Sequence, residues 1–360
     1  MSHSRRDFLR QSALATLAVS LPFSNQLMAM GATAKPFGLQ LWSVKEALTK
    51  DPKGVLKQLS SFGYKKLESF EGAQGMFWGM KNTEFKKLMN DLGMNLVSSH
   101  CDNTKDFERK AAEAGVIYSM ASGDQPALIA ELVDWARTIG LEVVCAGKGT
   151  KYLPIYHQST PDTVWGHYGF SEEQVAGGDF NAQMFNSFLD GTKSAIEMAA
   201  VSNATGLLPA SDGLQFPPCG VDDLARVLRP RSSGGVLAHR GQVEVISSLE
   251  RDERPVFRDL RWGVYVTMAG DSEYVRRCFK EYGLVTDPSG EFTSMYKPFH
   301  LIGLELGISI ASVGLRAEPT GAPIAWHADV VATAKRDLKV GERLDGEGGF
   351  TVYGRLMPAS

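Results

Sequence analysis

From residue 35 onward, short apolar runs alternate with longer segments in which apolar residues recur every three or four positions. The short runs predict strands and the longer segments predict helices. In the first part of the chain, strands are predicted over 37–42, 66–70 and 95–99, and the helices between them begin near Asp51 and Thr83. A further helix is predicted over 106–114. Strands that alternate with helices imply a parallel sheet with crossover helices.

A second stretch of alternation follows. A strand over 116–121, a helix over 126–139 and a strand over 141–146 form a βαβ pattern, typical of the second half of a nucleotide-binding sheet. Gly147-Lys148-Gly149 comes next, and its two glycines favour a turn. Ligands of parallel sheets bind at the carboxyl ends of strands, so Lys148 is a candidate contact for a phosphate or a carbonyl oxygen. The alternative is an ordinary surface turn.

The region 151–323 mixes helices with strands of antiparallel character. Its clearest strand is predicted over 263–268 and its longest helix over 182–206. The segment 301–315 is almost wholly apolar and too short to span a membrane, so it predicts a buried helix. Residues 329–342 predict a strand and a turn.

The predicted helix over 182–206 carries a line of polar residues. These are Asn186, Asp190, Lys193 and Glu197, at spacings of four, three and four, so they share one face of a continuous helix. If this face borders a cavity, Asp190 and Lys193 are suited to proton transfer, since a lysine near a carbonyl can donate to the developing oxyanion. The alternative is a solvated face of weak ion pairs.

Other polar residues are weaker candidates for substrate contacts. His157 and Thr160 follow the Lys148 turn closely, and His300 opens the apolar segment. Glu68 and His100 lie at predicted strand ends in the first part of the chain. A structural role is the alternative for each of them. The histidines show no HxxxH or HExxH spacing, so a metal site is not predicted.

Composition narrows the class of protein. The chain has 360 residues, enough for roughly two domains, and 43% hydrophobic residues support a folded core. Its net charge of -3 gives no reason to propose nucleic acid as a partner. The four cysteines contain no CxxC pair and indicate neither a disulfide framework nor a zinc site.

The first residues resemble an export signal. A twin-arginine pattern, Ser4-Arg5-Arg6-Asp7-Phe8-Leu9, precedes an apolar stretch over 12–23, and Ala32-Thr33-Ala34 offers a cleavage site. The apolar stretch is shorter than the ~20 residues of a membrane span. We therefore predict a signal peptide over 1–34 and a periplasmic location. The alternatives are a tail that matches by chance and a cytoplasmic enzyme.

The first part of the chain resembles exported sugar-phosphate isomerase/epimerase proteins, which are xylose-isomerase-like TIM barrels. The resemblance is carried by FGLQLWSVKEAL, GYKKLESFEG, FWGMKN and LGMNLVSSHCD, and covers about residues 5–115. It amounts to three βα units of the eight that a barrel needs. No later segment resembles the strands that carry that family's metal ligands.

The remainder resembles the DRL-type oxidoreductases, which are 1-deoxy-D-xylulose-5-phosphate reductoisomerase-like and homoserine-dehydrogenase-like. The matching segments include YSMASGDQPALIAELVDWARTIGLEVVCAGKGTKYLP, HQSTPDTVW and NSFLDGTKSAIEMAAVSNATGL. The resemblance implies use of NADP or NAD and a small polyhydroxylated substrate. It also implies that Lys148, Asp190 and Lys193 are catalytic. From their positions in the chain, His157, Thr160, Asn186 and His300 are predicted to contact substrate, and Gly147 and Gly149 to contact the cofactor. Residues 329–358 resemble the first part of a SAF domain.

The chain departs from that family where the cofactor should bind. No GxGxxG motif follows any predicted strand, so the phosphate cradle is missing and cofactor binding is expected to be poor. We predict an α/β fold in which partial TIM-like units join half a Rossmann sheet, followed by an α+β catalytic domain and a small β SAF-like segment. The predicted domains are 1–34 (signal), 35–115 (isomerase-like), 116–150 (half Rossmann), 151–323 (catalytic) and 324–360 (truncated SAF-like).

Three functions remain open. The first is an NAD(P)-dependent oxidoreductase or reductoisomerase, acting on a sugar phosphate or sugar acid and impaired by its missing fingerprint. The second is an exported sugar-phosphate isomerase/epimerase, and the third is a non-catalytic fusion or sugar-binding protein. A small molecule is the expected partner in each case. The sequence leaves open the substrate and whether the chain forms a homo-oligomer.

Overall fold

The computed structural model describes residues 38–102, 105–106, 110, 117–178 and 180–359. It divides into two compact units, residues 1–116 and 117–360. The predicted signal peptide and the junction between the two resemblances lie outside the described residues. So does most of the helix predicted over 106–114.

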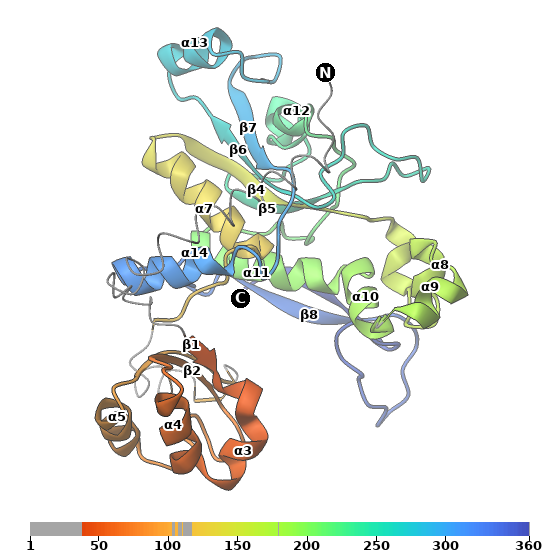
Figure 1. The fold of residues 1–360 in the computed structure, drawn as a ribbon. Helices are drawn as coiled ribbons and strands as arrows, with labels where there is room; N and C mark the ends of the chain where they lie inside the picture. The colour runs from red at the N-terminus through yellow and green to blue at the C-terminus, as the bar shows by residue number, and fades with distance from the viewer. Residues whose placement is uncertain (1–37, 103–104, 107–109, 111–116, 179, 360) are drawn as a thin grey trace, which may run out of the picture. The chain divides into compact units, whose positions relative to one another are not determined.

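Unit 1 contains a parallel sheet of three strands in the order β1–β2–β3 (Figure 1). The strands are β1 (Gly38–Gln40), β2 (Lys66–Phe70) and β3 (Asn95–His100), with helices α3 (Lys45–Lys50), α4 (Pro52–Ser61) and α5 (Asn82–Asp91) and the 3-10 turn η1 (Leu41–Val44). The side chain of Asp51 starts α4 by accepting a hydrogen bond from Gly54 N at 2.9 Å. Leu56, Leu67 and Phe85 are among the apolar side chains between sheet and helices. The alternation predicted for this part is confirmed.

Unit 2 is built on a mixed sheet in the order β5–β4–β6–β7. The strands are β4 (Glu142–Thr150), β5 (Gln242–Ser247), β6 (Val264–Ala269) and β7 (Phe292–Lys297). β4 is parallel to β5 but antiparallel to β6. The strand predicted over 116–121 is wrong for residues 117–121, which are not in a strand. The half-Rossmann arrangement therefore lacks its first strand among the described residues.

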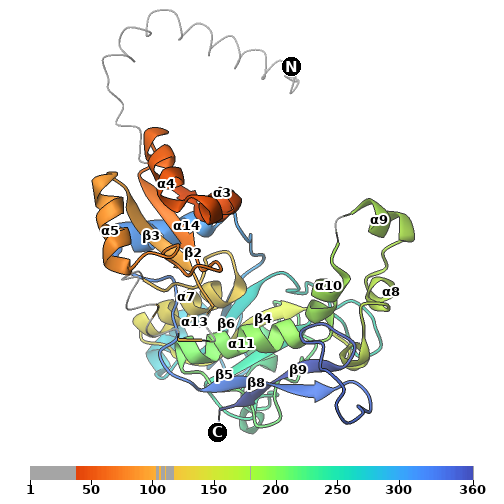
Figure 2. The same cartoon turned by 90° about the horizontal axis from the view of Figure 1, so that it is seen from below.

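Two long helices cover one face of this sheet (Figure 1). They are α7 (Gln125–Thr138) and α11 (Thr192–Thr205), whose apolar residues pack on β4, β5 and β6. The opposite face is covered by the segment that contains α12 (Leu224–Val227). Helix α11 also packs on the antiparallel pair β8 (Ala328–Ala334) and β9 (Val352–Pro358), so it lies between this pair and the sheet (Figure 2).

The helix predicted over 182–206 is two helices. α10 (Ala182–Leu189) ends at Asp190, and α11 begins after Gly191, which has a φ of 92°. That angle lies in the left-handed region that favours glycine, so the chain changes direction there. The change of direction breaks the helical phase on which the polar line of the prediction depended.

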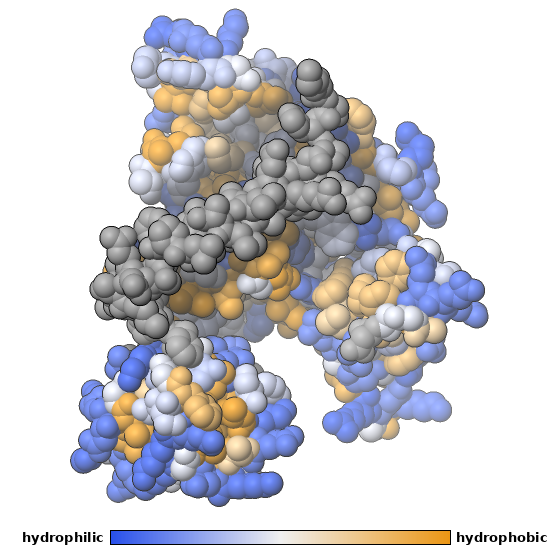
Figure 3. Space-filling model, in the orientation of Figure 1, coloured by the Kyte–Doolittle hydropathy of each residue, from blue (hydrophilic) through white to orange (hydrophobic). Residues whose placement is uncertain are grey.

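The buried helix predicted over 301–315 is also wrong. Its residues form the short helix α14 (Leu306–Ala311) and the π-helical turn η4 (Ser312–Arg316), and many of its apolar side chains are exposed. Leu304 is 81% exposed and Leu315 85%. On the side shown in Figure 3, unit 2 has patches of hydrophobic surface, whereas the rim of unit 1 is mostly hydrophilic.

The remaining elements of unit 2 are short. They are η2 (Pro154–Gln158), α8 (Val164–Tyr168), α9 (Glu172–Gly177), η3 (Arg231–Ser233) and α13 (Glu273–Glu281). Among the helices in the described part of the chain, none is long and apolar enough to cross a membrane.

Candidate functional site

Lys148 lies inside strand β4 and not in a turn after it, which corrects the prediction. The two glycines beside it are required by close backbone packing. A Cβ on Gly147 would lie 1.7 Å from Glu244 O, and one on Gly149 would lie 1.9 Å from Leu260 O. The space beside both glycines is therefore filled by the protein's own backbone.

Lys148 belongs to a polar and charged cluster formed by residues of β4, α7 and α11. We name this cluster the lysine centre, and its members are Gln125, Lys148, Lys193 and Glu197. The Lys148 ammonium donates to Gln125 Oε1 at 2.9 Å and to Glu197 Oε2. Lys193 Nζ lies 3.4 Å from the other carboxylate oxygen, Glu197 Oε1. The side chains of Lys148 and Glu197 are 7% and 6% exposed, and that of Lys193 is 28% exposed.

The lysine centre holds two ammonium groups and one carboxylate. Apart from the ion pair with Lys193, Glu197 Oε1 has no hydrogen-bond donor among the described residues. Lys193 Nζ also lies 4.7 Å from the centroid of the Phe188 ring. A nearly buried excess of one positive charge favours an oxygen that carries or gains negative charge. Lys193, the more exposed lysine, is the group able to meet such an oxygen.

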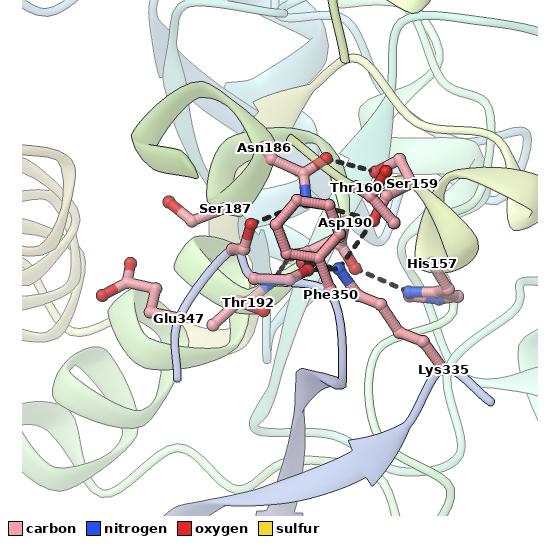
Figure 4. Close-up of polar contacts among 12 residues, drawn as sticks. His157, Ser159, Thr160, Asn186, Ser187, Asp190, Thr192, Lys335, Glu347 and Phe350 are labelled. Atoms are coloured by element: carbon pink, nitrogen blue, oxygen red, sulfur yellow. Dashed lines mark hydrogen bonds and ion pairs between the residues drawn. The ribbon is translucent and has the colours of Figure 1, made fainter. Parts of the chain in front are cut away.

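Asp190 does not join this centre, although the prediction placed it on the same helix face as Lys193. It lies in a second cluster at the break between α10 and α11, which we name the helix joint (Figure 4). Its carboxylate is fully buried and accepts from Lys335 Nζ at 2.8 Å and from Thr192 N at 2.9 Å. Burial raises the pKa of Asp190, and the hydrogen bond from Lys335 opposes that rise.

The predicted substrate contacts His157 and Asn186 also belong to the helix joint. His157 lies with Nδ1 2.7 Å from Asp190 O and Nε2 3.0 Å from Tyr152 Oη, and burial lowers its pKa. Asn186 is completely buried, donates to Ser159 O at 3.0 Å, and accepts from Ser159 Oγ at 2.6 Å. Their polar atoms are occupied within the protein, which indicates a structural role.

Thr160 and His300 lie apart from the helix joint's hydrogen bonds. The backbone of Thr160 donates to Thr163 Oγ1 at 2.9 Å, at the start of α8. His300 Nδ1 lies 2.7 Å from Trp262 O, and the next residue, Gly263, accepts from Gln125 Nε2 at 3.3 Å. The backbone at 262–263 therefore connects His300 with the lysine centre.

A cavity of 180 Å³ lies beside the helix joint. Its lining includes His157, Gly191, Ala195 and Tyr353. Within α11, Ala195 faces away from Lys193 and Glu197, because successive residues turn by about 100° around a helix. This cavity is therefore on the other side of α11 from Lys193.

Three contributors to these clusters were not predicted. Glu197 was placed on the polar line without a role, and neither Gln125 nor Lys335 was singled out. Gln125 could have been found from the sequence. Helix α7 directly precedes β4 and packs against it, so the first residue of α7 lies near the last residues of β4. Lys335 is 145 residues from Asp190 in the chain, and no local pattern links the two.

Glu68 and His100 contact each other in unit 1. They lie on the neighbouring strands β2 and β3, with Glu68 Oε1 3.0 Å from His100 Nε2. The His100 side chain is 69% exposed.

Comparisons with known proteins separate the two parts of the chain. A solved structure of a sugar phosphate isomerase/epimerase from Parabacteroides distasonis is 27% identical over 30% of this chain and 49% of its own, with a TM-score of 0.20. This chain thus spans about half the length of that protein, and the TM-score gives no support for a shared fold. No curated protein matches. The family model for the catalytic domain of oxidoreductase DRL matches residues 123–306. Both resemblances seen in the sequence are present, and the chain belongs to the DRL oxidoreductase family.

Proposed function

We propose that unit 2 binds the substrate and transfers protons in an oxidoreductase that acts on a small polyhydroxylated sugar phosphate or sugar acid. The observation that carries this proposal is the lysine centre, in which Lys148 and Lys193 share one carboxylate. Family membership supports the oxidoreductase class. The finer assignment of substrate follows from charge and from the family resemblance.

Lys193 is the proposed proton donor. Its ammonium is partly exposed, so it can contact an oxygen atom of a substrate, while Glu197 holds it in place from the other side. Lys148 is nearly buried and donates to Glu197 and Gln125, so its part is to supply positive charge and to orient Glu197. A positioned donor of this kind typically contributes 10²–10⁴-fold to a rate.

An anionic substrate fits the charge of this centre. Replacing water at the excess positive charge by a carboxylate or phosphate oxygen would balance the two lysines. Sugar phosphates and sugar acids carry such an oxygen.

The family suggests a nicotinamide cofactor, but the predicted cofactor residues do not fit one. Gly147 and Gly149 are packed against the backbone of Glu244 and Leu260, so neither can line a phosphate cradle. We infer that Gly147 and Gly149 take no part in holding a dinucleotide. The assignments to NAD or NADP remain proposals.

Location and the alternative activity follow from the first part of the chain. We propose export to the periplasm on the basis of the twin-arginine pattern over 4–9. Unit 1 has a pocket of about 670 Å³ whose lining includes Trp42, Glu71 and His100, and the isomerase/epimerase alternative would use this pocket.

Titration calorimetry tests the proposal, with D-gluconate and D-ribose 5-phosphate as probes. We expect one of them to bind, and Lys193→Met to weaken binding at least about tenfold, since a charged hydrogen bond is worth about 1.5–3 kcal/mol. Lys297→Met is the matched control, because Lys297 forms a separate ion pair, with Glu131 at 2.6 Å. Equal binding by both variants would overturn the role of Lys193. A parallel titration of NADPH, followed by nicotinamide fluorescence, tests cofactor binding directly.

A further inference from the structure

The helix joint determines where α11 begins. Asp190 Oδ1 accepts from Thr192 N, a backbone donor in the first turn of α11, at 2.9 Å. Gly191 supplies the left-handed backbone angle between the two helices. Lys193 follows Thr192 directly, so the direction in which its side chain leaves the helix depends on this turn.

Lys335 holds Asp190 in place, although it follows Asp190 by 145 residues in the chain. It follows β8, its side chain is 2% exposed, and its ammonium donates to Asp190 Oδ2 at 2.8 Å. Its other two donors go to Ser159 O at 2.7 Å and Gly349 O at 2.8 Å. All three donors of the ammonium are therefore used, which leaves none for a ligand.

The same C-terminal segment is bonded to both helices at the joint. Gly354 N donates to Thr192 Oγ1 at 2.8 Å, on α11. Asn186 Nδ2 donates to Gly348 O at 2.9 Å, and Gln183 Nε2 to Glu347 O at 2.9 Å, both from α10. We name these contacts, with the Lys335–Asp190 pair, the C-terminal clasp (Figure 4).

Lys193 is sensitive to the angle of the joint because its contacts lie on both helices. Its ammonium lies 4.7 Å from the Phe188 ring of α10 and 3.4 Å from Glu197 Oε1 of α11. A change of angle between α10 and α11 would move one of these groups relative to the other. Lys193 can therefore keep both contacts only while the angle between α10 and α11 is unchanged.

We propose that Lys335 is a positioning residue: acting through Asp190, it fixes the first turn of α11 and keeps Lys193 between Phe188 and Glu197. Asp190 then serves the joint and does not transfer protons, because both of its oxygens are occupied within the protein. The importance of this positioning for activity rests on the proposed function. The geometric claim about Lys193 does not.

Acetylation of lysines by dilute acetic anhydride, read residue by residue by mass spectrometry, tests this claim without a substrate. In Lys335→Met, we expect Lys193 to be acetylated at least about threefold faster than in the wild type, because loosening of the joint exposes its ammonium. Lys280, on the separate helix α13, is the internal reference.

Arg229→Met is the matched control. Arg229 Nη1 pairs with the fully buried Asp287 at 2.8 Å, so this variant also removes the cation of a buried ion pair in unit 2. We expect it to lower the melting temperature without changing acetylation of Lys193. Unchanged acetylation in Lys335→Met, or an equal rise in Arg229→Met, would overturn the proposal.

A double variant tests whether Lys335 acts through Asp190. Once Asp190→Asn has removed the carboxylate, adding Lys335→Met should have little further effect, so Lys193 in the double variant should be acetylated within about twofold of the rate in Asp190→Asn alone. A further rise as large as the one that Lys335→Met causes by itself would show that Lys335 acts by another route, contrary to the proposal.

Should Lys335→Met fail to fold, Thr192→Ala breaks the clasp more gently. It removes the hydroxyl that accepts from Gly354 N. Thr205→Ala is its control, since Thr205 Oγ1 donates to Val201 O at the other end of α11. Faster acetylation of Lys193 in Thr192→Ala alone would support the proposal, and equal rates in the two variants would contradict it. Failure of the sugar titrations would affect the proposed function and leave these outcomes unchanged.

Discussion

The lysine centre and the helix joint bury their carboxylates in different ways, although one stretch of chain carries both. Two ammonium groups pair with Glu197, and one of them, that of Lys193, is partly exposed to solvent. Asp190 has a single ammonium, Lys335, whose three donors are all used inside the protein. Two conclusions follow from this difference. A buried cluster with equal positive and negative charge, and with every donor used within the protein, stabilises the fold. A cluster with an excess positive charge and a partly exposed donor can bind an anionic ligand.

Glu244 shows a third arrangement. This carboxylate on β5 is 1% exposed and forms no ion pair with a described residue. Backbone N–H groups solvate it instead, from Val245 at 2.9 Å, Gln215 at 3.0 Å and Phe216 at 3.3 Å. Burial raises its pKa to about 7 in spite of these donors. The backbone donors thus lower the pKa of this carboxyl but do not cancel the rise that burial causes.

The largest expected effect on stability comes from removing the shared carboxylate of the lysine centre. Glu197→Met leaves the buried ammonium of Lys148 without an anion, which should lower the free energy of unfolding by about 3–5 kcal/mol. The double variant Lys148→Met with Glu197→Met should recover to within about 1 kcal/mol of the wild type, because no buried charge remains. Urea unfolding measures both, and equal losses in the single and double variants would contradict this account.

The next largest effect is a pH dependence that Glu244 should cause. Its pKa in the folded protein, about 7, lies above the ordinary value of 4.5. Its stabilising contribution is therefore fully present below pH 4.5 and is lost as the pH rises through 7. The loss amounts to about 3 kcal/mol at most.

Unfolding of the wild type and of Glu244→Gln between pH 5 and pH 9 isolates this term. The wild type should lose stability with rising pH relative to the variant, and parallel curves would show that Glu244 does not titrate there. The comparison removes the effect of His157, whose pKa burial lowers. A lowered pKa acts in the opposite direction, since its contribution to stability is lost as the pH falls.

The smallest expected effect on stability is that of Lys193→Met. Its ion pair with Glu197 is long and partly open to solvent, so the free energy of unfolding should fall by less than about 1 kcal/mol. Turnover, once a substrate is known, should nevertheless fall by about 10²–10⁴-fold if Lys193 is the proton donor. A large loss of stability without a change in ligand binding would place Lys193 with Asp190 as a structural residue.

Regular elements were predictable because their side chains repeat with a fixed period. The strands β2 and β6 and the helix α7 lie within a residue or two of their predicted ranges. The apolar residues of β2 and of α7 each face one core, and β6 is apolar on both faces because both are buried, so local pattern and tertiary packing agree.

The site was predictable only in part because it depends on contacts distant in the chain. The two lysines that the structure brings together, Lys148 and Lys193, were both singled out, but Asp190 was placed with Lys193 because one continuous helix was predicted. Gly191 inside that helix was the available warning, since glycine weakens a helix and often ends it. The pairing of Asp190 with Lys335 had no comparable signal.

Two further errors came from features that a pattern cannot distinguish. Gly147-Lys148-Gly149 has the composition of a turn, yet its glycines serve close packing of backbones within a sheet. The apolar run over 301–315 has the composition of a buried helix, yet much of it is exposed in unit 2. Composition reports how apolar a segment is and leaves open what lies against it.

The C-terminal clasp can form only late in the synthesis of the chain. Asp190 is synthesised 145 residues before Lys335. At ribosomal rates of about 5–20 residues per second, this delay is on the order of 10 s. During that interval a nascent chain carries the α10–α11 joint without its counter-ion. The newly made joint therefore passes through a period in which chaperones and proteases can reach it before its own lysine does.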